Sequence, residues 1–308
     1  NILFKIVDEE QPTHMAIAFD LKAPTFRHKM YEAYKGTRKG MPDELRVQLP
    51  IMKDVLNAMQ LKIYEKEGYE ADDLLGTLAK KAEKEGFDVS LVSGDRDLLQ
   101  IATDRIKIRI PKTKGFGTEV EDYYSKDVEE KYGVTPTQFI DLKGLMGDSS
   151  DNIPGVAGVG EKTATKIIKE YGSIEEAYNN IDTLMPKRVA EKLVQGRDLA
   201  FLSKELATIK TDCEIEGELE DTVFHQEYDE NVYELFKRLE FKNLLKRINV
   251  SVEKPNNTVD LSIVIITNQQ ELKELVKKAI NSPLVAIKLF TTFEISGLSV
   301  AIDDTSAY

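Results

Sequence analysis

Apolar residues in the first half of the chain follow two alternating spacings, one typical of strands and the other typical of helices. Runs of strand formers occupy residues 14–20, 88–93 and 106–110, and the first two lead into acidic residues. Apolar residues three or four apart occupy residues 45–60 and a segment that begins with Glu70. This alternation predicts an α/β fold with a mainly parallel sheet.

A Gly/Lys loop is expected at residues 112–118, followed by helices at 125–132 and 136–146. Beyond the glycine-rich turn the pattern is helical, with helices expected at residues 162–171, 174–179, 186–195, 197–208, 231–239 and 242–247. EKPNN at residues 253–257 is typical of a linker, and a strand, a helix and a strand are expected at 261–266, 269–280 and 284–289. We therefore divide the chain into a core at residues 1–145, a helical subdomain at 146–250, a linker at 251–260 and the start of a second α/β domain at 261–308.

Composition narrows the class of protein. A net charge of −12 argues against general binding of polyanions over the whole surface. Cys213 is the only cysteine, so an intrachain disulfide is excluded and a reducing, cytoplasmic compartment is expected. No apolar run approaches the roughly 18 residues of a membrane span. We expect a monomer that does not bind a membrane.

Basic residues outnumber acidic ones between residues 22 and 46, and Phe26, Tyr31 and Tyr34 are interleaved with them. Two interpretations remain open for this segment. It is either a solvated basic face or a local phosphate-binding segment with aromatic rings for base stacking.

Acidic residues follow the predicted strands or open the predicted helices at four distant places. They are Asp20; Glu70, Asp72 and Asp73; Asp95 and Asp97; and Asp148 and Asp151. An Asp after a strand is also an ordinary turn former, and acids in a first helical turn complement the helix dipole. If all lie at one sheet edge, however, their repulsion requires cations. Oxygen ligands suit Mg²⁺ or Mn²⁺, and two such ions about 3.5–4 Å apart can activate water against a phosphodiester.

The stretch GDSSDNIPGVAGVGEK at residues 147–162 joins two of these acids to a glycine-rich turn that opens a helix. Free backbone N–H groups in such a turn, together with a helix N-terminus, can bind a phosphate. A plain turn is the alternative. The glycine spacing differs from that of a dinucleotide-binding loop.

Several of these motifs together resemble the 5′-nuclease domain of bacterial DNA polymerase I, within the flap endonuclease superfamily. They are YKGTRKGMP at 34–42, EADD at 70–73, SGDRD at 93–97 and MGDSSDNIPGVAGVGEKTA at 146–164, and the match runs from residue 1 to about residue 250. The resemblance implies a PIN-like core, a helical arch at about residues 22–60 and a helix-hairpin-helix-type subdomain that grips duplex DNA. It implies a structure-specific nuclease that uses two or more Mg²⁺ or Mn²⁺ ions, with K⁺ at the hairpin.

The resemblance also implies roles for individual residues. Metal binding is expected for Asp20, Glu70, Asp72, Asp73, Asp95, Asp97, Asp148 and Asp151. Tyr34, Lys35 and Arg38 match arch positions near the scissile phosphate. Arg27, Lys39, Gly155, Gly158, Gly160 and Lys162 are expected to contact DNA. Expected partners are 5′-flapped or nicked duplex DNA, RNA-primer/DNA junctions and a polymerase domain in the same chain.

Two departures from the family pattern carry expectations of their own. The family begins with a strand that bears a further metal-binding Asp, and no such strand precedes Asn1, so weak activity is expected of this sequence alone. LVAIKLFTT at residues 284–292 resembles the first strand of a 3′-5′ exonuclease-like domain. Lys288 and Phe290 stand where proofreading members carry acids, so no proofreading is expected.

Two other functions compete with a 5′ nuclease. A DNA-binding module without catalysis would use the hairpin and the basic segment but would leave the acids unexplained. A PIN-like ribonuclease acting on single strands would use the acids, but it would leave the duplex-gripping hairpin unexplained.

Overall fold

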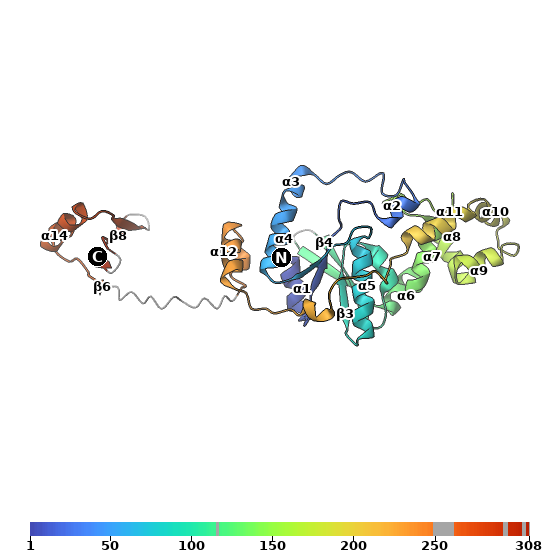
Figure 1. Ribbon diagram of the computed structural model, residues 1–308, viewed down its shortest axis with the longest axis horizontal. Helices are drawn as coiled ribbons and strands as arrows, with labels where there is room; N and C mark the ends of the chain where they lie inside the picture. The colour runs from blue at the N-terminus through green and yellow to red at the C-terminus, as the bar shows by residue number, and fades with distance from the viewer. Residues whose placement is uncertain (115–116, 249–261, 292–294, 304–305, 308) are drawn as a thin grey trace. The chain divides into compact units, whose positions relative to one another are not determined.

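The computed structural model describes residues 1–114, 117–248, 262–291, 295–303 and 306–307 (Figure 1). The chain divides into two compact units, Asn1–Ile248 and Asn249–Tyr308. The predicted linker at residues 251–260 lies outside the described residues. In the part of the chain that is described, no helix combines the length and the apolar character needed to cross a membrane.

The strands of the first unit form two groups. Strand β1 (Ala16–Ala18) pairs in parallel with β2 (Lys62–Tyr64), and β3 (Val89–Val92) pairs in parallel with β4 (Ile106–Lys114). Strand β5 (Gly117–Tyr123) closes an antiparallel hairpin with β4. The prediction of a mainly parallel α/β core is confirmed. The prediction of a loop at residues 112–118 is wrong, because most of this segment belongs to the hairpin.

An apolar cavity of about 470 Å³ is lined by residues of both strand groups, including Ala16, Ala18 and Leu91. Helices α1 (Ile2–Glu10) and α5 (Ala71–Lys84) contribute further lining residues. Among the described residues, β1 and β3 share no ladder of hydrogen bonds.

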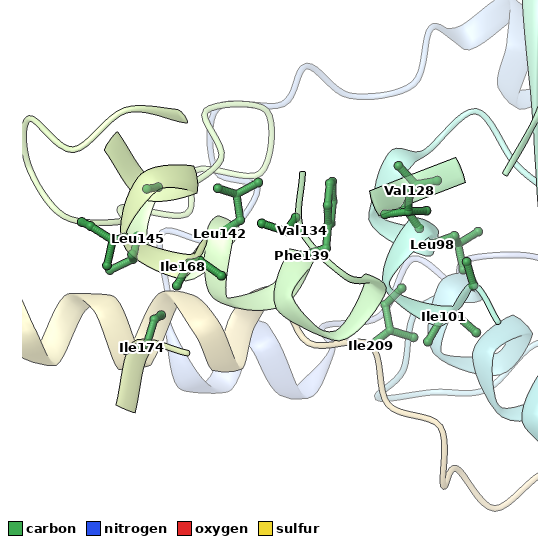
Figure 2. Packing of buried hydrophobic residues seen from close by; sticks show 14 of the residues in the cluster. Leu98, Ile101, Val128, Val134, Phe139, Leu142, Leu145, Ile168, Ile174 and Ile209 are labelled. Atoms are coloured by element: carbon green, nitrogen blue, oxygen red, sulfur yellow. The ribbon is translucent and has the colours of Figure 1, made fainter. Parts of the chain in front are cut away.

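Helix α7 (Pro136–Met146) is the central element of the hydrophobic core. Thr135 caps its N-terminus by accepting a hydrogen bond from the Gln138 N–H, and Pro136 fits the first helical position. Phe139, Leu142 and Leu145 belong to one buried cluster with Leu98, Ile101, Ile168, Ile174 and Ile209 (Figure 2). Helix α7 therefore packs against both the strand-bearing part and the helical part of the unit.

The predicted helices of the helical part are present within one or two residues of their expected ends. They are α6 (Ser125–Tyr132), α8 (Glu161–Tyr171), α9 (Ile174–Asn179), α10 (Lys187–Gln195), α11 (Arg197–Ala207), α12 (Glu230–Arg238) and α13 (Lys242–Leu245). Two 3-10 helices accompany them, η1 (Arg96–Ile101) and η2 (Leu219–Thr222).

The predicted arch contains α2 (Phe26–Met30), α3 (Asp43–Arg46) and α4 (Gln48–Ala58), with an irregular stretch between α2 and α3 (Figure 1). Its tip exposes large apolar side chains, including Leu45, Val47 and Met52.

The described residues of the second unit form a sheet with the strand order β6-β9-β8-β7 and the helix α14 (Gln269–Ile280). The strands are β6 (Ser262–Ile263), β7 (Ala286–Thr291), β8 (Ile295–Ala301) and β9 (Ser306–Ala307). Lys288 lies in β7 opposite Ser299. The absence of proofreading stays a prediction.

We predict that Gly144→Ala destabilises the first unit. A Cβ at this position would lie 2.6 Å from Ile174 Cδ1 and 3.0 Å from Lys204 Cβ. Overpacking of this kind costs about 1–3 kcal/mol, which exceeds the gain in helix propensity of about 1 kcal/mol. Chemical denaturation measures the effect. Gly40→Ala is the matched control, because its Cβ would meet nothing within 4 Å. Equal stability of the two variants would contradict the packing described for α7.

Candidate metal centre and phosphate-binding site

The N-terminus of α5 places three of the predicted acids side by side. Glu70 is the N-cap residue of the helix, and Asp72 lies in its first turn. Asp20 follows β1, and its Oδ1 accepts a 2.7 Å hydrogen bond from the Ala71 N–H. The positive end of the helix dipole therefore faces carboxylates from two elements.

Lys143 of α7 links the acids after β3 to the acids after α7. Asp95 caps η1 by accepting a hydrogen bond from the Asp97 N–H at 2.9 Å. The Lys143 ammonium lies 2.7 Å from Asp97 Oδ1 and also contacts Asp148 Oδ2. Lys143 was not predicted as a site residue, although its place five residues before Asp148 in a predicted helix was a signal.

The pKa values show which carboxylates share one electrostatic environment. Burial, together with the charges of Asp95, Asp20, Glu70 and Asp97, raises the pKa of Asp72 to about 7. Burial also raises the pKa of Asp97 to about 6, with contributions from Asp95 and Asp148 and in spite of the opposing charge of Lys143. Burial works against ionisation of Asp148 as well, but hydrogen bonds from Lys143 and Ser150 lower its pKa to about 2. Acids from all four predicted places except Asp73 and Asp151 thus interact within this group.

A second group of charges lies beside the first and shares Glu70 with it. The Lys35 ammonium lies 2.7 Å from Glu70 Oε1 and 3.8 Å from Asp151 Oδ2. The Arg38 guanidinium contacts Asp151 Oδ1. The buried Tyr34 hydroxyl lies 3.2 Å from both Glu70 Oε2 and Asp151 Oδ2. Because Tyr34 is only 3% exposed, it holds these carboxylates rather than facing a phosphate directly.

Two backbone contacts fasten the arch to the acidic loop. The Lys35 N–H donates to the Asp151 carbonyl at 2.8 Å, and Asn152 Nδ2 donates to the Ala33 carbonyl at 2.6 Å. Lys35 and Asn152 both have positive φ, 54° and 57°. A lysine in this region is strained, and such strain persists only where the surroundings hold it. Asn152 was not predicted as a site residue, because an asparagine in a turn is an ordinary feature of sequences.

The carboxylates suit a divalent cation by their chemistry. Their oxygens are hard ligands, and an added positive charge would relieve the repulsion that raises the pKa values of Asp72 and Asp97. As they are arranged, no three His, Cys, Asp or Glu side chains among the described residues are close enough to hold one ion. Lys143, Lys35 and Arg38 instead bind carboxylate oxygens. A bound metal ion would therefore displace these basic side chains from the carboxylate oxygens.

Two predicted roles are corrected. Both Asp73 oxygens bind the Arg27 guanidinium at 2.7 Å, and the side chains are 0% and 3% exposed. Asp73 is thus paired with Arg27 at the border of the acidic cluster, and the buried Arg27 is not accessible to DNA.

The glycine turn is partly internal. The Gly155 N–H donates to Ser203 Oγ at 2.8 Å, and a Cβ there would lie 2.3 Å from the Gly147 nitrogen. The predicted DNA contact of Gly155 is therefore corrected to a packing role.

The remaining residues predicted to contact DNA are exposed, as a phosphate contact requires; they are Gly158, Gly160, Lys162 and Lys39. Gly160 caps α8, so the helix N-terminus opens toward solvent.

Comparison with known proteins gives matches over most of the chain. Residues 1–133 match the family model "5′-3′ exonuclease, N-terminal resolvase-like domain", and residues 134–231 match "5′-3′ exonuclease, C-terminal SAM fold". DNA polymerase I of Bacillus subtilis (strain 168) is 47% identical over 270 residues, which are 87% of this chain and 30% of that protein. DNA polymerase I of Bacillus caldotenax is 48% identical over 247 residues, 80% of this chain and 28% of that protein. The chain thus spans about 30% of the length of these relatives.

Solved structures share the fold at lower identity. T5 5′-exonuclease with bound divalent zinc ions superposes with a TM-score of 0.56 at 22% identity, over 80% of this chain and 88% of that one. A T5 D15 flap endonuclease complex with DNA and metal ions gives 0.57 at 22%, over 80% and 87%. The catalytic core of Rad2 with a DNA substrate gives 0.50 at 16%, over 75% and 79%. These likenesses establish the mixed α/β architecture.

We predict that Asp72→Asn stabilises the metal-free protein at pH 8. The folded state raises the pKa of Asp72 from about 3.8 to about 7, so ionisation costs stability progressively as the pH rises from 4 to 7. The variant avoids this loss, and its Tm in the presence of a chelator should exceed that of the parent by at least about 2–4 °C. The difference should vanish toward pH 4. Asp54→Asn, on the exposed face of α4, is the control without effect. An Asp72→Asn variant no more stable than the parent at pH 8 would refute the shared repulsion.

Proposed function

The chain belongs to the 5′-3′ exonuclease family, and on this premise we propose that the protein is a structure-specific 5′ nuclease that hydrolyses phosphodiesters with the help of divalent metal ions. One observation carries the proposal: carboxylates from four separate segments share one electrostatic environment, and cations of the arch border it. Carboxylates alone would attract ions, and cations alone would attract phosphate. Because the carboxylates and the basic side chains lie side by side, a phosphodiester could contact the bound ions and the basic side chains at the same time.

The proposed metal site contains Asp20, Glu70, Asp72, Asp95, Asp97, Asp148 and Asp151. We propose two or more Mg²⁺ or Mn²⁺ ions, which when bound would activate water and stabilise the leaving oxygen. The oxygen-only donor set supports this choice of ion. At the glycine turn we propose K⁺, and the Lys192 ammonium 2.9 Å from the Gly158 carbonyl supports a cation there.

Residues of the arch would act on the phosphate. The Lys35 ammonium is 19% exposed on the side chain and borders the carboxylates, so it can bind a phosphate oxygen on which charge develops. Arg38 is more exposed and can bind the same or the adjacent phosphate. Burial and the charge of Glu70 raise the pKa of Tyr34, so its hydroxyl stays protonated and continues to donate to the carboxylates.

The proposed substrates are 5′-flapped or nicked duplex DNA and RNA-primer/DNA junctions. Gly158, Gly160 and Lys162 would bind duplex phosphates, and Lys39 would bind the strand that passes the arch. Such contacts position a duplex without reading its sequence. We propose that the protein acts as a monomer and as the 5′-nuclease part of a DNA polymerase I, in replication and repair.

We predict Mg²⁺-dependent cleavage of a 5′-flapped duplex, with no cleavage of single-stranded RNA or blunt duplex. Asp148→Ala should reduce the rate about a hundredfold or more, because it removes an ion ligand and leaves Lys143 partly unpaired. Binding of the flap in Ca²⁺ should persist. Asp182→Ala, an exposed acid far from the cluster in sequence, is the control.

The other outcomes of this assay are decisive. Cleavage of single-stranded RNA in preference to the flap would indicate a ribonuclease. Flap binding without any cleavage in the full-length protein would indicate a DNA-binding module.

We predict that Lys35→Ala lowers kcat on the flap by about 10²–10³-fold, because a cation that stabilises developing charge is lost. The Kd for the flap should change less than tenfold, since other phosphate contacts remain. Lys126→Ala, on the exposed surface of α6, is the matched control. Single-turnover kinetics separate the two effects. A loss confined to binding would show that Lys35 only holds the substrate.

A further inference from the structure

The Asp73 carboxylate has no capacity left for a metal ion. Its Oδ2 accepts hydrogen bonds from Arg27 Nη1 at 2.7 Å and from the Glu70 N–H at 3.0 Å. Its Oδ1 accepts from Arg27 Nη2 at 2.7 Å and from the Lys210 N–H at 2.9 Å. A carboxylate offers about four acceptor sites, so all are used. An ion could bind only if a buried guanidinium lost its partner.

Arg27 uses four of its five N–H donors in buried hydrogen bonds. Its Nε donates to the Leu206 carbonyl and its Nη2 to the Thr208 carbonyl, both at 2.8 Å. Its Nη1 also lies 3.6 Å from Glu70 Oε2. One guanidinium therefore joins α2, the start of α5 and the chain that leaves α11.

That chain, residues 206–213, is here called the strap. Gln100 of η1 binds it on both sides, because its amide donates to the Ala207 carbonyl and accepts from the Ile209 N–H, each at 2.9 Å. Thr77 of α5 accepts a hydrogen bond from the Cys213 N–H at 3.2 Å. The strap is thus fastened to η1 and α5, the two elements whose starts carry Asp95, Asp97, Glu70 and Asp72.

We propose that Arg27 and Asp73 are positioning residues, which lock the strap against the elements that carry the carboxylates and bind neither metal nor DNA. This inference rests on the proposed function, since the geometry it protects is that of the nuclease site. Replacing a buried ion pair by apolar residues is often neutral for stability, so such a pair is better explained by the arrangement it enforces. Here the arrangement joins the helical part to the acidic cluster.

Neighbouring residues on α5 allow a direct test of the metal assignment. Asp72 faces Asp20 and Asp95, whereas Asp73 is turned about 100° around the helix, toward Arg27. Mn²⁺ titration without DNA should show that Asp73→Asn keeps the number of bound ions and an affinity within about threefold. Its Tm should fall by more than about 5 °C, because Arg27 loses its charged partner. Asp72→Asn should lose an ion or at least tenfold in affinity without a lower Tm.

A second variant keeps the test decisive if Asp73→Asn does not fold. The double variant Arg27→Met with Asp73→Leu removes both charges and leaves none unpaired. It should fold, bind Mn²⁺ as the parent does, and cleave the flap with a kcat at least tenfold lower and an unchanged KM. A merely structural pair would leave kcat intact in a folded double variant. Loss of an ion, or full kcat, would overturn the proposal.

DNA binding gives an independent measurement. In the double variant, the slope of log Kd against log salt for the flap should equal that of the parent, whereas Lys162→Ala should reduce the slope by about one phosphate contact. A reduced slope in the double variant would show that Arg27 contacts DNA and would overturn the inference. If even the parent protein binds no Mn²⁺, the proposed function fails, while the salt slope still tests the role of Arg27.

Discussion

The repulsion among carboxylates at the ends of β1, β3 and α7 and at the start of α5 is the constraint on which the rest of the structure depends. Burial strengthens it, because the ionised form of each acid loses hydration as well as facing like charges. The chain offsets part of this cost with cations from different elements, Lys143 from α7 and Lys35 from the arch. The repulsion that these lysines do not offset gives the cluster an affinity for further positive charge, which a metal-dependent enzyme needs.

This arrangement also explains why the two parts of the first unit cannot be independent. Lys143 reaches the acids only because α7 is held between η1 and the helices α8 and α11, which the hydrophobic cluster around Phe139 and Leu142 provides. Gly144 permits α11 to approach α7 closely on another side. The helical part that would bind duplex phosphates and the strand-bearing part that carries the acids thus share one core, so duplex and cluster keep a fixed distance.

Sequence periodicity predicted most helices and the strands β1, β3 and β4, because amphipathic spacing reports burial directly. It missed β2 and the hairpin strand β5, since three residues show no periodicity and GTEVEDY is too polar to stand out. Of the acids it grouped, Asp73 pairs instead with Arg27, and metal binding by the others stays a prediction. Adjacent residues in one motif, Asp72 and Asp73, face opposite environments, and only the position of Arg27, 46 residues earlier, decides between them. Two residues that pair over such a distance along the chain leave no local pattern in the sequence.

In the arch, too, contacts with a distant segment fix the position of a charged side chain. Lys35 has a positive φ that a lysine adopts only under constraint, and the constraint comes from the Asp151 carbonyl and the Asn152 side chain. With this backbone the Lys35 ammonium lies 2.7 Å from Glu70 Oε1. The constraint thus accompanies a cation held beside carboxylates, for which the phosphate of the proposed substrate would compete. An arch cation held in this way is already in place when substrate arrives, which lowers the entropy that must be lost on binding.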